Sequence, residues 1–134
     1  MRASLLVVAT LLLIACAAPD EKDGRREDTA ITDFIEVNEL VPVDAIRTLD
    51  QLVGRKVNDT YYIVSTRKQD YLLEYYSPCM PRYDDGRVEP DRRQDARALY
   101  QRLDTFRGCR IKAIYAITPG QVDEVREIGR SIGG

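Results

Sequence analysis

The hydrophobic and polar positions of the chain form blocks of different kinds. An almost unbroken apolar run covers residues 5–14. Residues 60–66 and 71–76 are rich in β-branched and aromatic side chains and flank the polar connection 67–70, which is typical of a β-hairpin. Residues 109–117 alternate apolar and polar positions and predict a further strand.

Two further segments predict helices near the ends of the folded part. Residues 29–40 carry apolar side chains at helical spacing: Ile31, Phe34 and Ile35. Asp28 or Thr29 is expected to cap this helix, and Pro42 to stop it. Residues 118–121 read Thr-Pro-Gly-Gln, a capping box with proline at the first helical position. A terminal helix is expected to follow, with an apolar face of Val122, Val125 and Ile128, and to fray from Gly129 onward.

The remaining segments leave one region ambiguous. Asn58 and Asp59 signal a turn and suggest a preceding strand over residues 53–57. Residues 96–106 fit both a helix and an extended segment, and we favour a short helical turn followed by a strand. The whole predicts an α+β fold: a small antiparallel sheet of four or five strands, short flanking helices and one disulfide, in a single domain over residues 29–134.

The N-terminal block has the features of an export signal. Arg2 precedes the apolar run, which is too short to span a bilayer as a mature helix. The run ends in Leu13-Ile14-Ala15-Cys16, which resembles the bacterial lipobox. The resemblance implies that residues 1–15 are removed and that the Cys16 thiol carries a diacylglycerol, so that two or three acyl chains hold the protein in a membrane. The competing interpretation is an ordinary secretory signal cleaved after Ala17 or Ala18.

The residues after Cys16 bear on where the anchor lies. Ala17, in place of aspartate, resembles the pattern of Gram-negative lipoproteins sent to the outer membrane, facing the periplasm. Residues 16–28 contain Pro19, Gly24 and mixed charges with almost nothing to bury, so we expect a flexible tether.

Two cysteines remain once Cys16 is acylated. Export would place Cys79 and Cys109 outside the reducing cytosol, and we expect them to form one structural disulfide. The alternative is a reactive thiol pair. Such pairs typically have a Cys-x-x-Cys spacing or a thiolate near the start of a helix.

The region around these cysteines resembles a known family. Tyr71-Leu72-Leu73, Ser77-Pro78-Cys79, Asp104 before Phe106, and Cys109-Arg110-Ile111 follow one another as in an uncharacterised family of small proteobacterial envelope proteins. The resemblance covers residues 49–118. It implies a periplasmic location and supports the two-cysteine bridge, and it brings no activity because the family is a domain of unknown function.

Composition excludes several chemistries. The chain has no histidine, so a Ser-His-Asp triad, a Cys-His pair and the usual zinc sites are excluded. A net charge of -2 argues against nucleic acid as a partner.

Two groups of side chains could have a function, but each also has a simpler structural explanation. Four carboxylates in one loop could bind calcium, although interleaved arginines favour a solvated network of ion pairs: Asp84, Asp85, Glu89 and Asp91, with Arg82, Arg87, Arg92 and Arg93. The hairpin tyrosines could form an exposed recognition patch, although core packing explains them sufficiently: Tyr61, Tyr62, Tyr71, Tyr75 and Tyr76.

We therefore assign the chain no catalytic residue, no metal ligand and no cofactor. The sequence favours a lipid-anchored, periplasm-facing envelope protein that acts as a non-enzymatic binding or accessory module, with the membrane and an envelope protein as partners. The alternative is a small hydrolase that uses carboxylates on an envelope polymer.

Overall fold

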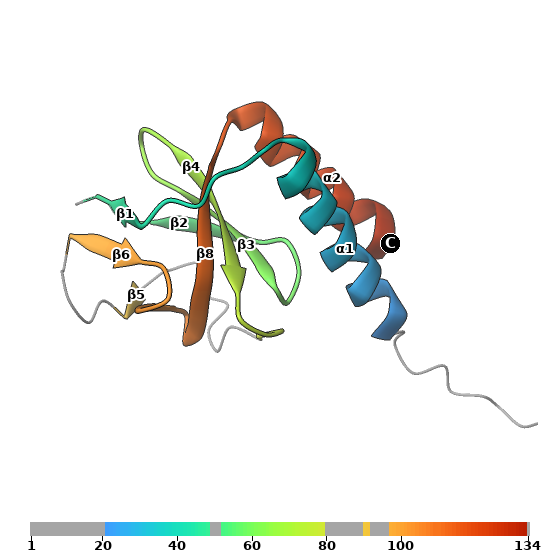
Figure 1. Cartoon of the computed structure of the whole chain (residues 1–134), viewed down its shortest axis with the longest axis horizontal. Helices are drawn as coiled ribbons and strands as arrows, with labels where there is room; N and C mark the ends of the chain where they lie inside the picture. Colours follow the sequence, from blue (N-terminus) through green and yellow to red (C-terminus); the bar gives the residue numbers. More distant parts are fainter. Residues whose placement is uncertain (1–20, 49–51, 80–89, 92–96, 134) are drawn as a thin grey trace, which may run out of the picture.

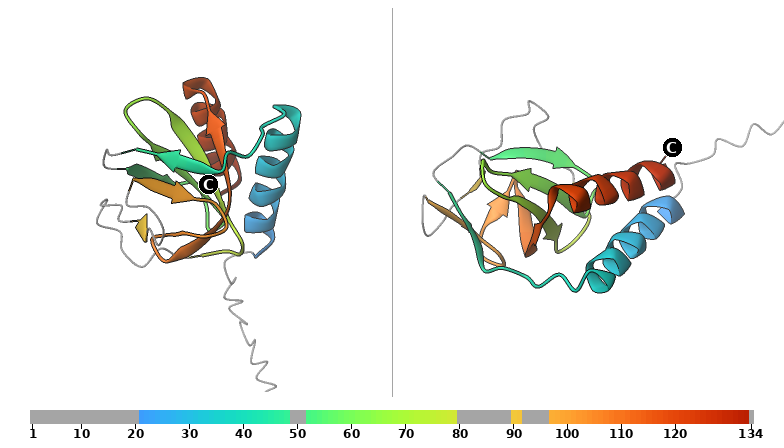
Figure 2. Two further views of the ribbon diagram at one scale, coloured as in Figure 1. Left: turned by 60° about the vertical axis from the view of Figure 1, so that its left-hand side comes forward. Right: turned by 90° about the horizontal axis from the view of Figure 1, so that it is seen from above.

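The computed structural model describes residues 21–48, 52–79, 90–91 and 97–133 (Figure 1). Two helices, α1 (Glu21–Val37) and α2 (Pro119–Gly133), run antiparallel beside each other and cover one face of a sheet (Figures 1 and 2). None of the described helices has the length and apolar composition needed to cross a membrane.

All strand pairings in the described part are antiparallel. The main sheet has the order β2-β3-β4-β8-β7-β5. Its members are β2 (Val53–Lys56), β3 (Tyr61–Ser65), β4 (Asp70–Tyr75), β8 (Cys109–Ile117), β7 (Thr105–Phe106) and β5 (Pro90–Asp91). A separate two-stranded ribbon pairs β1 (Ala45–Arg47) with β6 (Ala98–Tyr100). The α+β class and the antiparallel sheet are confirmed, with β2, β3, β4 and β8 as its longer strands.

The predicted hairpin is present as β3 and β4. Ser65 pairs with Asp70 at the closed end, and Tyr61 pairs with Glu74 at the open end. The Thr66 amide donates to the Gln69 carbonyl at 2.9 Å, which closes the connecting turn. The Gln69 side chain also donates to the Ile117 carbonyl on β8 at 2.7 Å. The turn is therefore fixed to the neighbouring strand as well as to its own hairpin.

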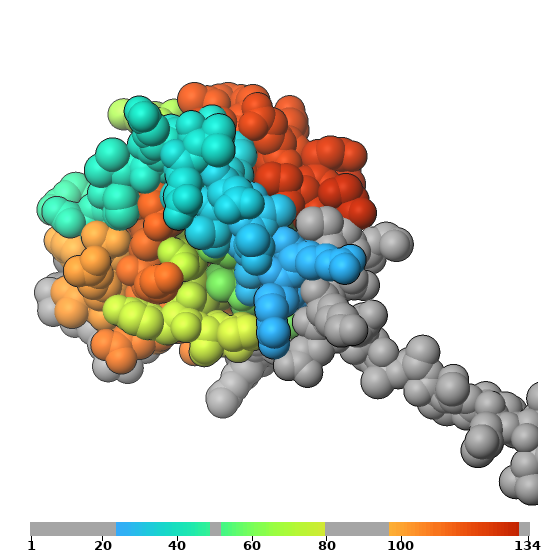
Figure 3. Space-filling model, turned by 45° about the vertical axis from the view of Figure 1, so that its right-hand side comes forward, coloured from blue at the N-terminus to red at the C-terminus, as the bar shows by residue number. Residues whose placement is uncertain are grey.

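The central strands β3 and β4 are buried on both faces, whereas the edge strand β2 is largely exposed. On the helix side, α1 and α2 cover a cluster formed by Ile31, Phe34, Tyr61, Ile63, Leu72, Ala113, Tyr115, Ile117 and Val125. The side chains on the opposite face pack into a second cluster, which consists of Ile46, Leu52, Tyr62, Val64, Leu73, Tyr75, Leu99, Phe106, Cys109, Ile111 and Ile114. The space-filling view shows α1, in blue, lying across the molecule between the red α2 and the yellow-green β4 region (Figure 3).

The capping box of α2 is confirmed and its expected fraying is wrong. The Thr118 amide donates to the Gln121 side chain at 2.9 Å, and the Gln121 amide donates to the Thr118 hydroxyl at 3.3 Å. The helix continues past Gly129 because this residue packs against the sheet. A Cβ atom at Gly129 would lie 3.1 Å from Cγ1 of Val57, so glycine permits the close approach of α2 to the end of β2.

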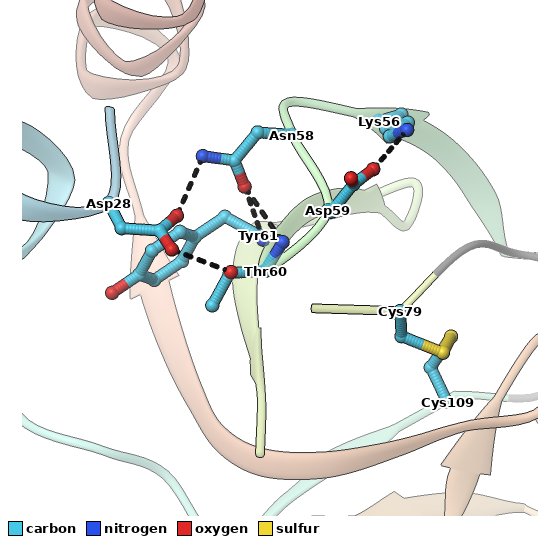
Figure 4. Close-up of polar contacts among 8 residues, drawn as sticks. All are labelled: Asp28, Lys56, Asn58, Asp59, Thr60, Tyr61, Cys79 and Cys109. Carbon is cyan, nitrogen blue, oxygen red and sulfur yellow. Dashed lines mark hydrogen bonds and ion pairs between the residues drawn. A yellow bond between two sulfur atoms is a disulfide. The ribbon is translucent and has the colours of Figure 1, made fainter. Parts of the chain in front are cut away.

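The expectation of a tether over residues 16–28 is wrong for residues 21–28, which form the first turns of α1. Asp28 lies inside the helix and does not cap it. Its carboxylate accepts hydrogen bonds from the Asn58 amide at 2.9 Å and the Thr60 hydroxyl at 2.8 Å (Figure 4). Asn58 in turn accepts from the backbone amides of Thr60 and Tyr61. The charged segment is therefore helical because one of its carboxylates binds the β2–β3 turn.

The helical turn favoured for residues 96–106 is also wrong. The described part of this segment, residues 97–106, contains β6, a turn and β7, as the extended interpretation allowed in part. The cause is pairing with a distant segment, since Leu99 of β6 pairs with Ile46 of β1. The fully buried Asp104 carboxylate accepts from the Tyr100 amide at 2.8 Å and holds the intervening turn.

We expect Asp28→Ala to lower the free energy of unfolding by about 1–3 kcal/mol, because two part-buried donors lose a charged acceptor. Urea denaturation measures the change. Asp33→Ala, at an exposed position of the same helix, is the matched control and should leave stability nearly unchanged. Equal stability of the two variants would show that the Asp28 contacts contribute nothing.

Candidate functional site

The two cysteines predicted to pair are joined. Cys79 follows β4, Cys109 begins β8, and their Cα atoms lie 5.8 Å apart. Cys109 is 1 % exposed, and the Cys79 amide donates to the Asp59 carbonyl at 2.7 Å. The bridge therefore ties β8 to the turn that also binds α1. For a sequence separation of 30 residues, the chain-entropy model gives a stabilisation of about 3–4 kcal/mol.

Several predicted positions lie outside the described residues. Cys16 is among them, so its acylation stays a prediction. The same holds for Asp84, Asp85 and Glu89 and for the interleaved arginines, while Asp91 is described only as part of the backbone of β5. Among the residues that the structure does describe, no three acidic, cysteine or histidine side chains are grouped as a metal site would need.

The hairpin tyrosines are mainly core residues. Tyr61, Tyr62 and Tyr75 are each 2 % exposed, and Tyr71 packs against the core at its edge. Tyr76 alone of the five is exposed by half, and the Arg110 guanidinium lies 5.3 Å from its ring centroid. Core packing therefore accounts for the tyrosine usage.

A buried carboxylate lies under the helix layer. Glu74 is 9 % exposed. It pairs with Ala113 while the next residue pairs with Ile111, so Lys112 forms a bulge that is turned toward it. Lys112 makes an ion pair with one oxygen of Glu74, and the Tyr115 hydroxyl donates to the other at 3.3 Å. Both carboxylate oxygens are thus engaged within the fold.

Burial sets the acidity of the neighbouring phenols. It raises the pKa of Tyr61 to about 12, against the effect of a 3.2 Å hydrogen bond shared with the Thr32 hydroxyl. Burial also raises the pKa of Tyr115, with the negative charge of Glu74 as the second cause. These phenols stay protonated at neutral pH, so the group is a structural network.

A cleft with a strongly basic lining lies between β2 and α2. Its volume is about 260 Å³. Four cationic residues line it: Arg55, Lys56, Arg126 and Arg130. Val57 and Gly129, which pack against each other, complete the lining. Arg126 and Arg130 are spaced four residues apart, which places them on one face of α2. We call these four cations and the space between them the basic cleft.

The carboxylates near the basic cleft neutralise it only in part. Lys56 pairs with Asp59, Arg126 lies 3.7 Å from Asp123, and Arg130 lies 3.5 Å from Glu127. Each arginine contact uses one terminal nitrogen of a group that has five N–H donors. These pairs lie at the surface, where an ion pair contributes little to stability.

Sequence reasoning missed this cleft, and the basic cluster that it did consider is the set of arginines in the loop after Cys79. The basic residues come from two segments about seventy residues apart, and only the docking of α2 brings them together. The available signal was the pair of arginines on either side of Gly129 in the terminal helix.

We expect stability to fall as the pH rises from 10 toward 12. An unfolded tyrosine has a pKa near 10, whereas folded Tyr61 keeps its proton to about pH 12, so above pH 10 the unfolded state loses protons first and is favoured. Urea denaturation at pH 9, 10 and 11 measures the slope. Tyr61→Phe should flatten it, and Tyr76→Phe, which removes a half-exposed phenol, is the control. A slope insensitive to Tyr61→Phe contradicts the assignment.

Comparison with known proteins places the chain in a family. Neither the curated proteins nor the solved structures give a significant match. A family model described as a family of unknown function (DUF6491) matches residues 1–131, which include the N-terminal apolar run, Cys16 and both bridged cysteines. The match is wider than the region that suggested an uncharacterised family from the sequence. The chain belongs to DUF6491, a family of unknown function.

Proposed function

We propose that this protein is a lipid-anchored envelope protein whose folded domain is a non-enzymatic binding module. The anchor is proposed from the apolar run that ends in Leu13-Ile14-Ala15-Cys16. The family match supports it, because the family model includes this segment together with the folded part.

The disulfide supports an extracytoplasmic location. Structural disulfides persist in oxidising compartments and are rare in the cytosol. The Cys79–Cys109 bridge joins residues 30 positions apart, and Cys109 is buried. Both features are typical of a structural bridge. An envelope domain of this size benefits from such a constraint because its core is small.

The basic cleft is the observation that carries the binding role. Four cations line it, and its lining contains no nucleophilic side chain and no carboxylate. Two carboxylates that are at least partly buried in the described part of the chain make structural contacts. Asp28 binds Asn58 and Thr60, and Glu74 binds Lys112 and Tyr115. The arrangement favours recognition of an anion over cleavage of a polymer.

Replacing Cys16 tests the anchor. We expect the native protein to stay with the membrane fraction and to have a mature N-terminal Cys16 with acyl chains by intact mass. Cys16→Ser should lose the acyl mass and leave the membrane fraction, because its mature form has no lipid to insert. Ala18→Ser is the matched control, since it changes a small residue beyond the lipobox. Unchanged membrane retention of Cys16→Ser, or a mature chain that begins after Ala17, would overturn the proposal.

A further inference from the structure

The basic cleft is suited to a compact, multiply charged anion. A volume of about 260 Å³ accommodates a group of several water volumes, at about 30 Å³ each. Arginine binds phosphate oxygens through paired N–H donors, and lysine adds a point charge. The cleft supplies three arginines and one lysine, so a phosphate group can be contacted from both β2 and α2.

The cleft is fixed in place by the fold. Gly129 lets α2 approach Val57, and the Val57 amide donates to the Tyr61 carbonyl at 3.1 Å. Asn58 and Thr60, which follow immediately, are held by the Asp28 carboxylate of α1. The two backbone segments that carry the cations are therefore held in place before any ligand binds, which lowers the entropy cost of binding.

The start of α1 bears on which phosphate groups would lie close to the cleft if Cys16 is acylated. Helix α1 begins at Glu21, five residues after Cys16, and five residues extend over at most about 18 Å. The helices are antiparallel, so the second half of α2, with Arg126 and Arg130, lies beside the first half of α1 (Figure 1). An acylated Cys16 would hold this end of the domain at the membrane surface.

From these observations we infer that the basic cleft binds the phosphate groups of anionic lipid headgroups in the membrane that holds the anchor. The inference rests on the proposed lipid anchor for its source of phosphate. The lipids would bind non-covalently, through the donors that Arg55, Arg126 and Arg130 retain. The anchor and the cleft would then be two contacts with one membrane, the second of which fixes the orientation of the domain.

Arginine footprinting of the acylated full-length mature protein tests the inference. The protein is reconstituted in nanodiscs of phosphatidylcholine, with or without phosphatidylglycerol, and labelled with phenylglyoxal; mass spectrometry follows each arginine. We expect Arg126 and Arg130 to be labelled about fivefold or more slowly in the anionic discs, since one such contact contributes about that factor. Arg102, exposed in the turn between β6 and β7, is the internal control and should be labelled equally in both.

Variants and salt identify the cause of the protection. Arg55→Gln with Lys56→Gln should reduce the protection of Arg126, because the facing charges are lost. Arg67→Gln with Lys68→Gln, in the β3–β4 turn, removes the same charge and should leave the protection intact. In the native protein, raising the salt from 50 to 500 mM should abolish the protection, because charges are screened within a few ångströms. The salt experiment uses the native protein alone, so its result does not depend on whether a variant folds.

Other outcomes overturn the inference. Equal labelling of Arg126 in neutral and anionic discs would do so. Protection by inorganic phosphate in neutral discs, without protection in anionic discs, would identify a site for a soluble phosphate. Protection by an acidic peptide alone would identify a protein partner. Intact mass before reconstitution reports separately on the anchor: a chain without acyl chains fails the proposed function, and its flotation with anionic vesicles still tests the cleft.

Discussion

Burial of the central strands on both faces is the constraint on which the structure depends. Adjacent residues of β3 and β4, such as Tyr62 with Ile63 and Leu72 with Leu73, are buried against opposite sides of the sheet. A sheet of this kind needs a cover on each face, because exposed strands would leave two large apolar surfaces in water. The helices cover one face, and the β1–β6 ribbon with β7 contributes to the other. The arrangement of the remaining elements follows from this need.

Polar contacts decide how the helix layer lies on its face. The burial of apolar residues such as Ile31 and Phe34 is favourable without being directional, whereas the hydrogen bonds of a carboxylate with two donors require a defined geometry. Asp28 supplies that geometry by binding the β2–β3 turn, and the disulfide ties β8 to the same turn through Cys79 and Asp59 (Figure 4). With α1 fixed, α2 packs beside it and meets the end of β2 at Gly129. The basic cleft is a consequence of this packing.

Local signals in the sequence were enough for several elements. The β3–β4 hairpin, the strand Cys109–Ile117 and the capping box at Thr118 each depend on residues that are neighbours in the chain. The errors have a common physical origin in contacts between distant segments. The first turns of α1 have few apolar residues and are held by Asn58 and Thr60, and β6 exists because β1 pairs with it.

The candidate site was hidden from sequence reasoning for the same reason and for one more. Composition averages charge over the whole chain, and the net charge of -2 indicates no attraction to an anionic surface. Yet at physiological ionic strength a charge acts over about 8 Å, so a surface responds to the nearby cations and not to the sum. Four cations around a small cleft are such a local concentration, and the three carboxylates paired with them, Asp59, Asp123 and Glu127, are exposed. A chain with a net negative charge can therefore present a basic site, provided that the fold brings the basic residues of distant segments together.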